Sequence, residues 1–298
     1  MGAADVVPGV SGGTIAFITG IYEELLHSIS SVRLSLFTTW KTEGFLAAWK
    51  QLNGKFLIVL LAGIFTSIFS LAQVISYMLE NKAVMLWAFF FGLVLASVWL
   101  VGKEVGKWKG IHWILAILGA TIAWWITSLP PLSVKFDNGS MGDYFYLFLS
   151  GMIAICAMIL PGISGSFILL ILGSYTKAIN AVKELDVAKI AVFAAGAIIG
   201  LLAFSRVLNY LFEKFRAQTI AVLTGFLVGS LNKIWPWKEN AKLLYTHSDG
   251  KQDFLQANVL PNDYTGDPQI MSAILAFIVG ILVIVAMEIV ARKMEQKN

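Results

Sequence analysis

The chain has 298 residues, of which 58% are hydrophobic and 13% are charged, and its formal net charge is +4. A soluble domain carries roughly 25% charged residues, so this chain has too few charges to cover a water-soluble surface of its size. The composition excludes a soluble enzyme, a nucleic-acid-binding protein and, with a single cysteine, a disulfide scaffold. It predicts an integral membrane protein.

Six apolar segments are candidates for membrane-spanning helices, because a helix needs about 20 mostly apolar residues to cross the hydrocarbon core. The fifth is short, which in a transporter indicates a broken or tilted helix. In chain order the segments are Phe56–Leu79, Val84–Val101, Ile111–Leu129, Ile190–Leu211, Thr219–Leu231 and Ile270–Ala291.

Two further apolar segments, Met1–Ile29 and Tyr144–Val182, are interrupted near the middle by Pro-Gly and by Ser and Gly. We expect each to be a helical hairpin or pair of half-helices that enters the membrane and turns back. In Arg33–Lys55, aromatic and charged residues alternate, which predicts either a helix on the membrane surface or an ordinary cytoplasmic loop. The polar stretch Asn232–Gln269 is expected to lie outside the membrane.

The sequence contains an internal repeat in constant register. A first block recurs 153 residues further on, and a second block, which starts near Ala62, recurs after 133 residues. The first block pairs Pro8 with Pro161, Gly9 with Gly162, Ser11 with Ser164, Gly12 with Gly165, Gly20 with Gly173 and Tyr22 with Tyr175.

The repeat predicts an all-α polytopic membrane protein built from two related halves. Residues 1–129 form repeat one and residues 144–291 form repeat two, each with a re-entrant hairpin and about three transmembrane helices. An odd number of crossings separates the two copies, so they are expected to have inverted topology, as in secondary transporters.

The distribution of Lys and Arg predicts the orientation, because the side that holds more of them faces the cytoplasm. This rule places the C-terminus in the cytoplasm. Only seven residues precede Pro8, whereas Tyr144–Leu160 supplies 17 residues before Pro161. We therefore expect the natural protein to have further N-terminal residues that complete the first hairpin.

The two Pro-Gly-x-Ser-Gly turns are the candidate binding site. Proline ends a helix, glycine allows the turn, and serine is a favourable N-cap for a new half-helix. A helix N-terminus offers free amides and a positive dipole end, which favour an anion such as phosphate. The alternative is that the glycines only allow close helix packing. The predicted substrate-binding residues of the turns are Pro8, Gly9, Ser11, Gly12, Gly13, Thr14, Pro161, Gly162, Ser164, Gly165 and Ser166.

Charged residues within the membrane are costly and are therefore functional candidates. Arg206 lies in a predicted span and suits phosphate by its fork geometry, although it can equally snorkel to the nearby membrane surface. Asp5 precedes the first turn, and its counterpart in the repeat is Met158. It is a candidate for carrying a coupling proton or cation, or it simply caps the turn. Lys233, beside a Trp-Pro-Trp motif, is expected among lipid headgroups or on a lipid phosphate.

The segments GAADVVPGVSGGTIAFITGIYEEL, ILPGISGSFILLILGSY and GSLNKIWPWK resemble the signatures of the bacterial membrane family catalogued as domain-of-unknown-function family 368. Its members are assigned as polyprenyl-phosphate translocases of the PopT type. The resemblance runs nearly end to end. It implies a protein of the bacterial inner membrane that returns undecaprenyl phosphate from the outer to the cytoplasmic leaflet, with its binding loops at Pro8–Thr14 and Pro161–Ser166.

Two other functions compete with a lipid translocase. An intramembrane undecaprenyl-diphosphate phosphatase also has inverted repeats and Pro-Gly-x-Ser loops. Its loop, however, carries Arg directly after Ser, where this chain has Gly12 and Gly165. Of the three histidines, only His27 lies close enough to a hairpin to be tested as a catalytic group. A secondary transporter of small soluble anions fits the same turns. No metal or cofactor is expected beyond a coupling ion, proton or sodium.

Overall fold

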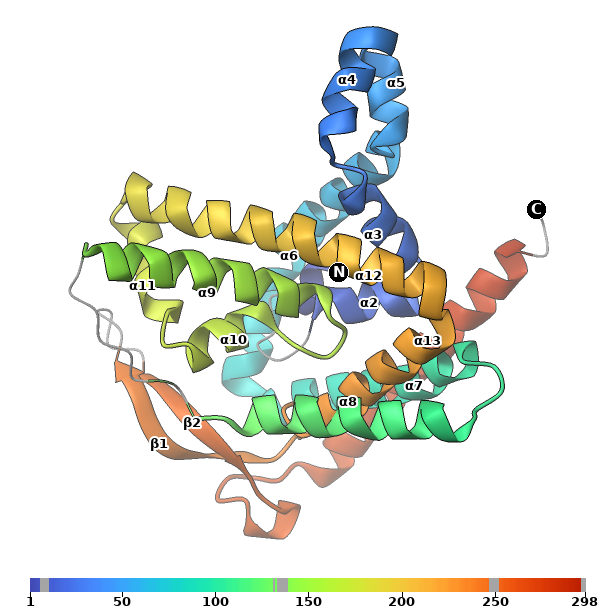
Figure 1. The fold of residues 1–298 in the computed structure, drawn as a ribbon. Helices are drawn as coiled ribbons and strands as arrows, with labels where there is room; N and C mark the ends of the chain where they lie inside the picture. The colour runs from blue at the N-terminus through green and yellow to red at the C-terminus, as the bar shows by residue number, and fades with distance from the viewer. Residues whose placement is uncertain (6–10, 131, 133–138, 247–251, 296–298) are drawn as a thin grey trace.

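The computed structural model describes residues 1–5, 11–130, 132, 139–246 and 252–295, and these are mostly helical (Figure 1). The helices are α1 (Gly2–Asp5), α2 (Gly12–Ile18), α3 (Tyr22–Ser30), α4 (Leu34–Glu43), α5 (Phe45–Gln51), α6 (Gly54–Asn81), α7 (Ala83–Glu104), α8 (Gly110–Ser128), α9 (Met141–Ile159), α10 (Gly165–Ile171), α11 (Tyr175–Lys183), α12 (Val187–Ser230) and α13 (Ile270–Glu295). A 3-10 turn (Pro261–Asp263) and two strands, β1 (Lys238–Thr246) and β2 (Gln252–Asn258), lie between α12 and α13.

Six helices in the described residues are long and apolar enough to cross a membrane, so the chain is a multi-pass membrane protein. They are α6, α7, α8, α9, α12 and α13. The predicted spans coincide with these helices, with two differences. The first is α9, which lies in the predicted second hairpin and is itself long enough to cross. Helices α10 and α11, which follow it, are bent by 109° relative to each other.

The second difference concerns the predicted spans Ile190–Leu211 and Thr219–Leu231. They are joined in one 44-residue helix, α12, which is bent at Phe215 (φ −135°, ψ 42°). The polar residues between Leu211 and Thr219 are helical, except for Phe215 at the bend. The label α12 thus covers two helices that meet at a kink, and the break predicted between Leu211 and Thr219 is present at Phe215.

Glycines set the closest helix contacts in the membrane-spanning bundle. A Cβ at Gly92 of α7 would lie 2.2 Å from the carbonyl oxygen of Phe277 in α13, and one at Gly280 of α13 would lie 2.2 Å from that of Phe89. Such small residues let two helix backbones approach, which is the usual way in which helices associate in lipid. Helix α12 packs in the same way on α8 and α9.

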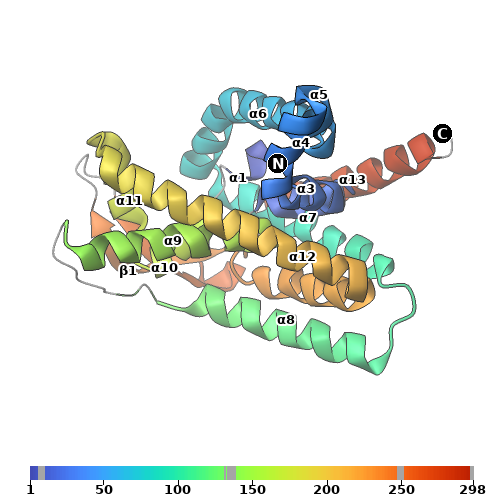
Figure 2. The same ribbon diagram turned by 45° about the horizontal axis from the view of Figure 1, so that its top comes forward.

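Helices α4 and α5 form an antiparallel pair that projects from the bundle at the top of Figure 1 and comes forward in Figure 2. Gly44, with φ +89°, ends α4 and reverses the chain. A side chain at this φ would be strained, which is why glycine stands there. The segment Arg33–Lys55, predicted as a surface helix or a loop, thus contains two helices that are joined at Gly44, and its position on a membrane surface stays a prediction.

The polar stretch Asn232–Gln269 contains an antiparallel β-hairpin, β1 with β2, which the sequence analysis did not predict. The hairpin lies at the same end of the molecule as α11, on the left of Figures 1 and 2, whereas the C-terminus lies at the opposite end. Two indoles hold its base in place: Trp235 Nε1 donates to Val259 O and Trp237 Nε1 donates to Pro268 O, each at 2.9 Å.

Candidate functional site

The first turn ends in the short helix α2, and its N-terminus is already capped within the chain. The Oγ atom of Ser11 accepts a hydrogen bond from Gly13 N at 3.1 Å. The Asp5 carboxylate, from α1, accepts one from Gly12 N at 2.7 Å. A carboxylate therefore occupies the position where the sequence predicted a substrate anion. Pro8 and Gly9, which were also predicted to bind substrate, lie outside the described residues.

The second turn connects α9 to α10 through Pro161–Ser164. Gly162 has φ +87°, and a Cβ there would meet Ser230 Oγ at 2.8 Å and Phe226 O at 3.0 Å. Glycine is therefore required both by the backbone angle and by the close approach to α12. The hydroxyls of Ser164 and Ser166 lie 2.9 Å apart. Within the described residues, the first-turn amides of α10 donate to no group in the chain, in contrast to those of α2.

The two turns, far apart in the sequence, are in direct contact. Ser11 Oγ donates to Met158 O at 2.9 Å, and Gly162 N donates to Thr14 Oγ1 at 2.9 Å. Gly13 faces the end of α9 so closely that a Cβ there would lie 2.5 Å from Ile159 O. The structure thus brings the predicted residues of both turns together, apart from the two that it does not describe.

This junction is closed to solvent. Ser11 and Thr14 are each 1% exposed and Ser164 is 7% exposed, and Gly12, Gly13, Gly162 and Gly165 are buried. Tyr22, from the start of α3, extends across the junction and donates from its hydroxyl to Ile159 O at 3.1 Å. A ligand can reach the turn amides only if the two halves move apart.

Arg206 is not brought to the turns. Its side chain is exposed on α12 and donates through Nη2 to the carbonyl oxygen of Val32, just after α3, at 2.7 Å. Its predicted contact with phosphate remains a prediction, and it would require a different arrangement of the helices.

The sequence analysis missed two ion-pair clusters at opposite ends of the bundle. Arg216, directly after the bend in α12, lies 2.9 Å from Glu23 and 2.8 Å from Glu104, with all three side chains about half exposed. At the other end, the buried carboxylate of Asp143 accepts a hydrogen bond from Lys177. Each partner is distant in sequence, so only a three-dimensional contact identifies these pairs.

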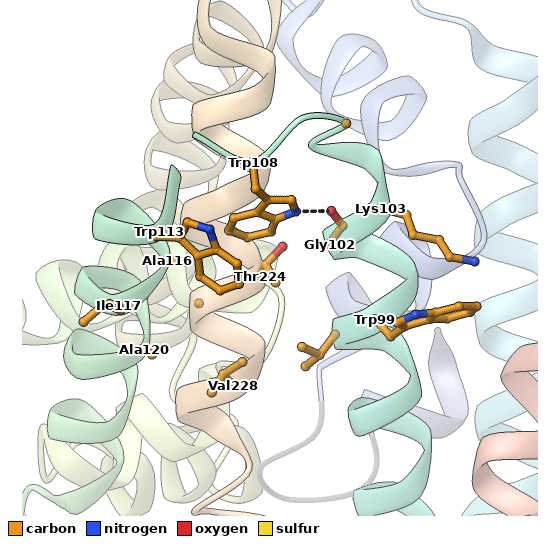
Figure 3. A pocket seen from close by; sticks show the side chains of 13 residues that line it. Trp99, Gly102, Lys103, Trp108, Trp113, Ala116, Ile117, Ala120, Thr224 and Val228 are labelled. Carbon is orange, nitrogen blue, oxygen red and sulfur yellow. Dashed lines mark hydrogen bonds between the residues drawn. The ribbon is translucent and has the colours of Figure 1, made fainter. Parts of the chain in front are cut away.

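Two apolar cavities open on the sides of the bundle. Figure 3 shows one of about 590 Å³, between α7, α8 and α12, where Trp108 donates to Gly102 O at 2.9 Å. The Lys103 ammonium lies 3.2 Å from the centroid of the Trp99 ring and is paired with Glu288, so it adds little unbalanced charge. The other cavity, of about 680 Å³, lies beside α1 and α2 and is lined by Ala4 and Ile15 among other apolar residues. Both cavities suit hydrocarbon chains rather than a charged group.

Fold and site together define a polytopic helical membrane protein in which two Ser-Gly turns meet inside the bundle. A model of the VCA0040-like family, described as undecaprenyl phosphate translocase-like, matches residues 1–252. The chain belongs to this family, which confirms the family resemblance of its motifs.

Two named proteins are similar to the chain over most of their length. A polyprenyl-phosphate transporter of Vibrio cholerae serotype O1 is 44% identical over 297 residues, which cover 98% of this chain and 94% of that protein. A polyprenyl-phosphate transporter of Staphylococcus aureus is 32% identical over 256 residues, which cover 79% of this chain and 83% of that protein. No solved structure is significantly similar to the chain.

Proposed function

We propose that the protein carries undecaprenyl phosphate across the bacterial inner membrane, from the outer to the cytoplasmic leaflet, and that it is a transporter rather than an enzyme. The observation that carries this proposal is the contact between the two turns, Ser11 Oγ to Met158 O and Gly162 N to Thr14 Oγ1. Non-helical backbone within a membrane is tolerated only where it is buried in protein or lines a polar cavity. The names of the relatives from V. cholerae and S. aureus support the substrate class.

An inverted repeat would let the two turns approach the membrane midplane from opposite sides. Its support is the agreement of local structure with the sequence register. Helices α2 and α10 both have seven residues and begin 153 residues apart, and α3 and α11 both have nine. The end of α6 at Lys82 (φ −141°, ψ 40°) has the same backbone angles as the bend in α12 at Phe215 (φ −135°, ψ 42°), 133 residues later.

In this mechanism the phosphate binds where the turns separate. The first-turn amides of α10 and the hydroxyls of Ser164 and Ser166 would donate to its oxygens, while the prenyl tail remains in lipid. The cavity of about 680 Å³ beside α1 and α2 would hold the first isoprene units. Rocking of one repeat against the other would then expose the phosphate to each leaflet in turn.

Inward transport requires a coupling ion, because the membrane potential, negative inside, opposes the inward movement of an anion. The opposing energy is about 2.3 kcal/mol per charge per 100 mV. We assign the coupling to Asp5, whose carboxylate occupies the N-terminus of α2 in the closed state. Uptake of a proton or sodium ion by Asp5 would weaken its hold on Gly12 N and free that amide when the substrate arrives.

The test is a leaflet-accessibility assay with labelled undecaprenyl phosphate in proteoliposomes, with and without a pH or sodium gradient. We expect protein-dependent movement of the lipid that one of the two gradients accelerates. Inorganic phosphate exchange and undecaprenyl diphosphate hydrolysis are measured with the same vesicles. Lipid movement equal to that in protein-free vesicles would contradict the proposal. Phosphate exchange alone would identify a small-anion transporter, and release of phosphate from the diphosphate would identify a phosphatase.

A further inference from the structure

Two lysines at the end of the bundle that carries the β-hairpin have no acidic partner. Lys238, the first residue of β1, places its Nζ 3.4 Å from the centroid of the Trp87 ring in α7. Lys233, between α12 and β1, places its Nζ 4.2 Å from the centroid of the Phe167 ring in the first turn of α10. Both ammonium groups therefore rest on aromatic faces, which stabilise a cation only in part.

Neither ammonium makes an ion pair or a hydrogen bond to any part of the chain that the structure describes. The Nζ of Lys238 is moreover buried. An ionised group in such a position is costly unless an opposite charge accompanies it. The nearby Glu239 does not supply that charge to the ammonium, since its Oε1 accepts a hydrogen bond from Thr265 N at 2.6 Å.

The electrostatics of the two lysines favour an added anion. Burial lowers the pKa of Lys238 well below its usual value, and the charge of Lys233 lowers it further. Burial also lowers the pKa of Lys233. A bound anion would act in the opposite direction on both groups, because it favours the charged form.

Beside Lys238 lies a cavity of about 420 Å³, lined by Trp87, Lys238, Glu239 and Asn240 among other residues, whereas Lys233 lies outside its lining. Its wall includes Ala83 and Val84, the first two residues of the 22-residue helix α7. The N-terminus of a helix presents free amides and the positive end of the dipole, which bind phosphate groups. Lys238 and the N-terminus of α7 thus line one cavity, whose wall includes the start of β1.

We propose that Lys238, Lys233 and the N-terminus of α7 form a docking site for a phosphomonoester, from which the phosphate passes to the second turn. Lys233 connects the two places, because it lies over Phe167 of α10 and follows Ser230, which contacts Gly162. The site would collect the headgroup from the leaflet on the hairpin side. The choice of a lipid as the source of the phosphate rests on the proposed function, whereas the phosphate chemistry does not.

The first test uses the wild-type protein in nanodiscs and an amine-reactive reagent, with the labelling of each lysine followed by mass spectrometry. The probes are inorganic phosphate, geranyl phosphate and geraniol, so that free phosphate, lipid phosphate and the bare prenyl chain are separated. We expect geranyl phosphate, and inorganic phosphate at higher concentration, to slow the labelling of Lys238 and Lys233. Equal labelling with and without both phosphates, or equal protection by geraniol, would overturn the proposal.

The second test compares Lys238→Met, Lys238→Arg and Lys41→Met in the leaflet-accessibility assay, with lipid supplied on the hairpin side. Lys41 is the matched control, since its ammonium also lies over a ring, that of Phe37, on the distant helix α4. We expect Lys238→Met to raise the half-saturating lipid concentration about tenfold with little change in maximal rate, because a charge-assisted hydrogen bond to phosphate is lost. Lys238→Arg should restore most of the affinity, and Lys41→Met should match the wild type.

An unchanged half-saturating concentration in Lys238→Met would overturn the docking site and leave Lys238 as a packing partner of Trp87. If that variant does not fold, the labelling of the wild-type protein decides whether phosphate binds at Lys238. The two tests distinguish a failure of the docking site from a failure of the proposed function. Protection of Lys238 without lipid movement would refute transport alone, and lipid movement without protection would refute the docking site alone.

Discussion

The two Ser-Gly turns have nearly the same sequence but different chemical environments. At the first turn, the N-terminus of α2 is filled by the Asp5 carboxylate and the Ser11 hydroxyl. At the second, the first-turn amides of α10 have no partner among the described residues. The counterpart of Asp5 in the repeat is Met158, which offers no charge. Two turns of similar sequence thus differ in charge balance: the N-terminus of α2 is neutralised from within, whereas that of α10 is not, although both lie in a junction closed to solvent.

This difference assigns separate roles to the two turns. The second turn would hold the substrate phosphate, and the first would respond to the coupling ion through Asp5. The hydrogen bonds between the turns link these events, because a change at one turn alters the contacts of the other.

The largest effect is expected for Gly162→Ala in the second turn. Its φ of +87° strains any side chain, and the new Cβ would collide with Ser230 Oγ and Phe226 O. We expect transport to fall by about 100-fold or more, because such a displacement misplaces the site. The control is Gly20→Ala, which has a similar φ of +74° but open space around the Cβ. Equal losses in the two variants, measured by leaflet accessibility, would attribute the effect to backbone strain alone.

Removal of the buried carboxylate of Asp143, at the start of α9, should have the next largest effect. Asp143 is paired with Lys177 and its side chain is 2% exposed, so Asp143→Asn removes the buried anion of the pair, whereas the Lys177 side chain is 29% exposed. Because the cation keeps partial contact with solvent, we expect a loss of about 2 kcal/mol in stability, the usual size for a hydrogen bond between charged groups. By contrast, Glu23→Gln breaks the ion pair with Arg216, whose side chains are 48% and 49% exposed, which should cost less than about 1 kcal/mol. Thermal unfolding in detergent compares the two, and an equal decrease in the midpoint would contradict the asymmetry.

Asp5→Asn tests the role of the first turn in coupling. The amide can still accept from Gly12 N, but it cannot take up a proton or bind a cation as a carboxylate does. We expect gradient-driven transport to fall about tenfold, which corresponds to about 1.4 kcal/mol. Exchange of lipid without a gradient should change much less. Retention of the full acceleration by the gradient would remove Asp5 from the coupling mechanism.

The smallest effect concerns a single hydrogen bond between the turns. Thr14→Val removes the hydroxyl that accepts from Gly162 N while keeping the shape of the side chain. The expected decrease in transport is about fivefold, in line with about 1 kcal/mol for one buried hydrogen bond. Thr19→Val is the matched control, since its hydroxyl bonds only within its own helix region, to Ile15 O and Ala16 O. Identical rates in both variants would show that the bond between the turns has no role in transport.

Much of the helical framework could be predicted from the sequence because apolar length fixes where a helix can cross lipid. The starts of α2 and α10 could be predicted because each helix begins directly after a serine that follows a Pro-Gly pair, and this signal depends only on neighbouring residues. The break near Phe215 could be predicted because polar residues interrupt the apolar sequence between Leu211 and Thr219. The reversal at Gly44 was missed because a lone glycine does not reveal its φ.

The candidate site was predicted in composition but not in its internal contacts. The sequence identified both turns, yet the capping of α2 by Asp5 depends on how α1 packs. Arg206 was selected for its charge and the predicted depth of its helix, and only the fold places it against Val32. Lys238 was passed over because its lack of a partner is a property of the packed structure.

The central claim is that the phosphate is held where the two turns meet. Its most direct test is photo-crosslinking of the wild-type protein with a polyprenyl phosphate that carries a diazirine next to the phosphate, followed by mass spectrometry of the crosslinked peptides. The account predicts crosslinks in both Ser11–Thr14 and Pro161–Ser166, which excess undecaprenyl phosphate abolishes. Crosslinks that avoid both segments, or that persist unchanged under competition, would contradict it.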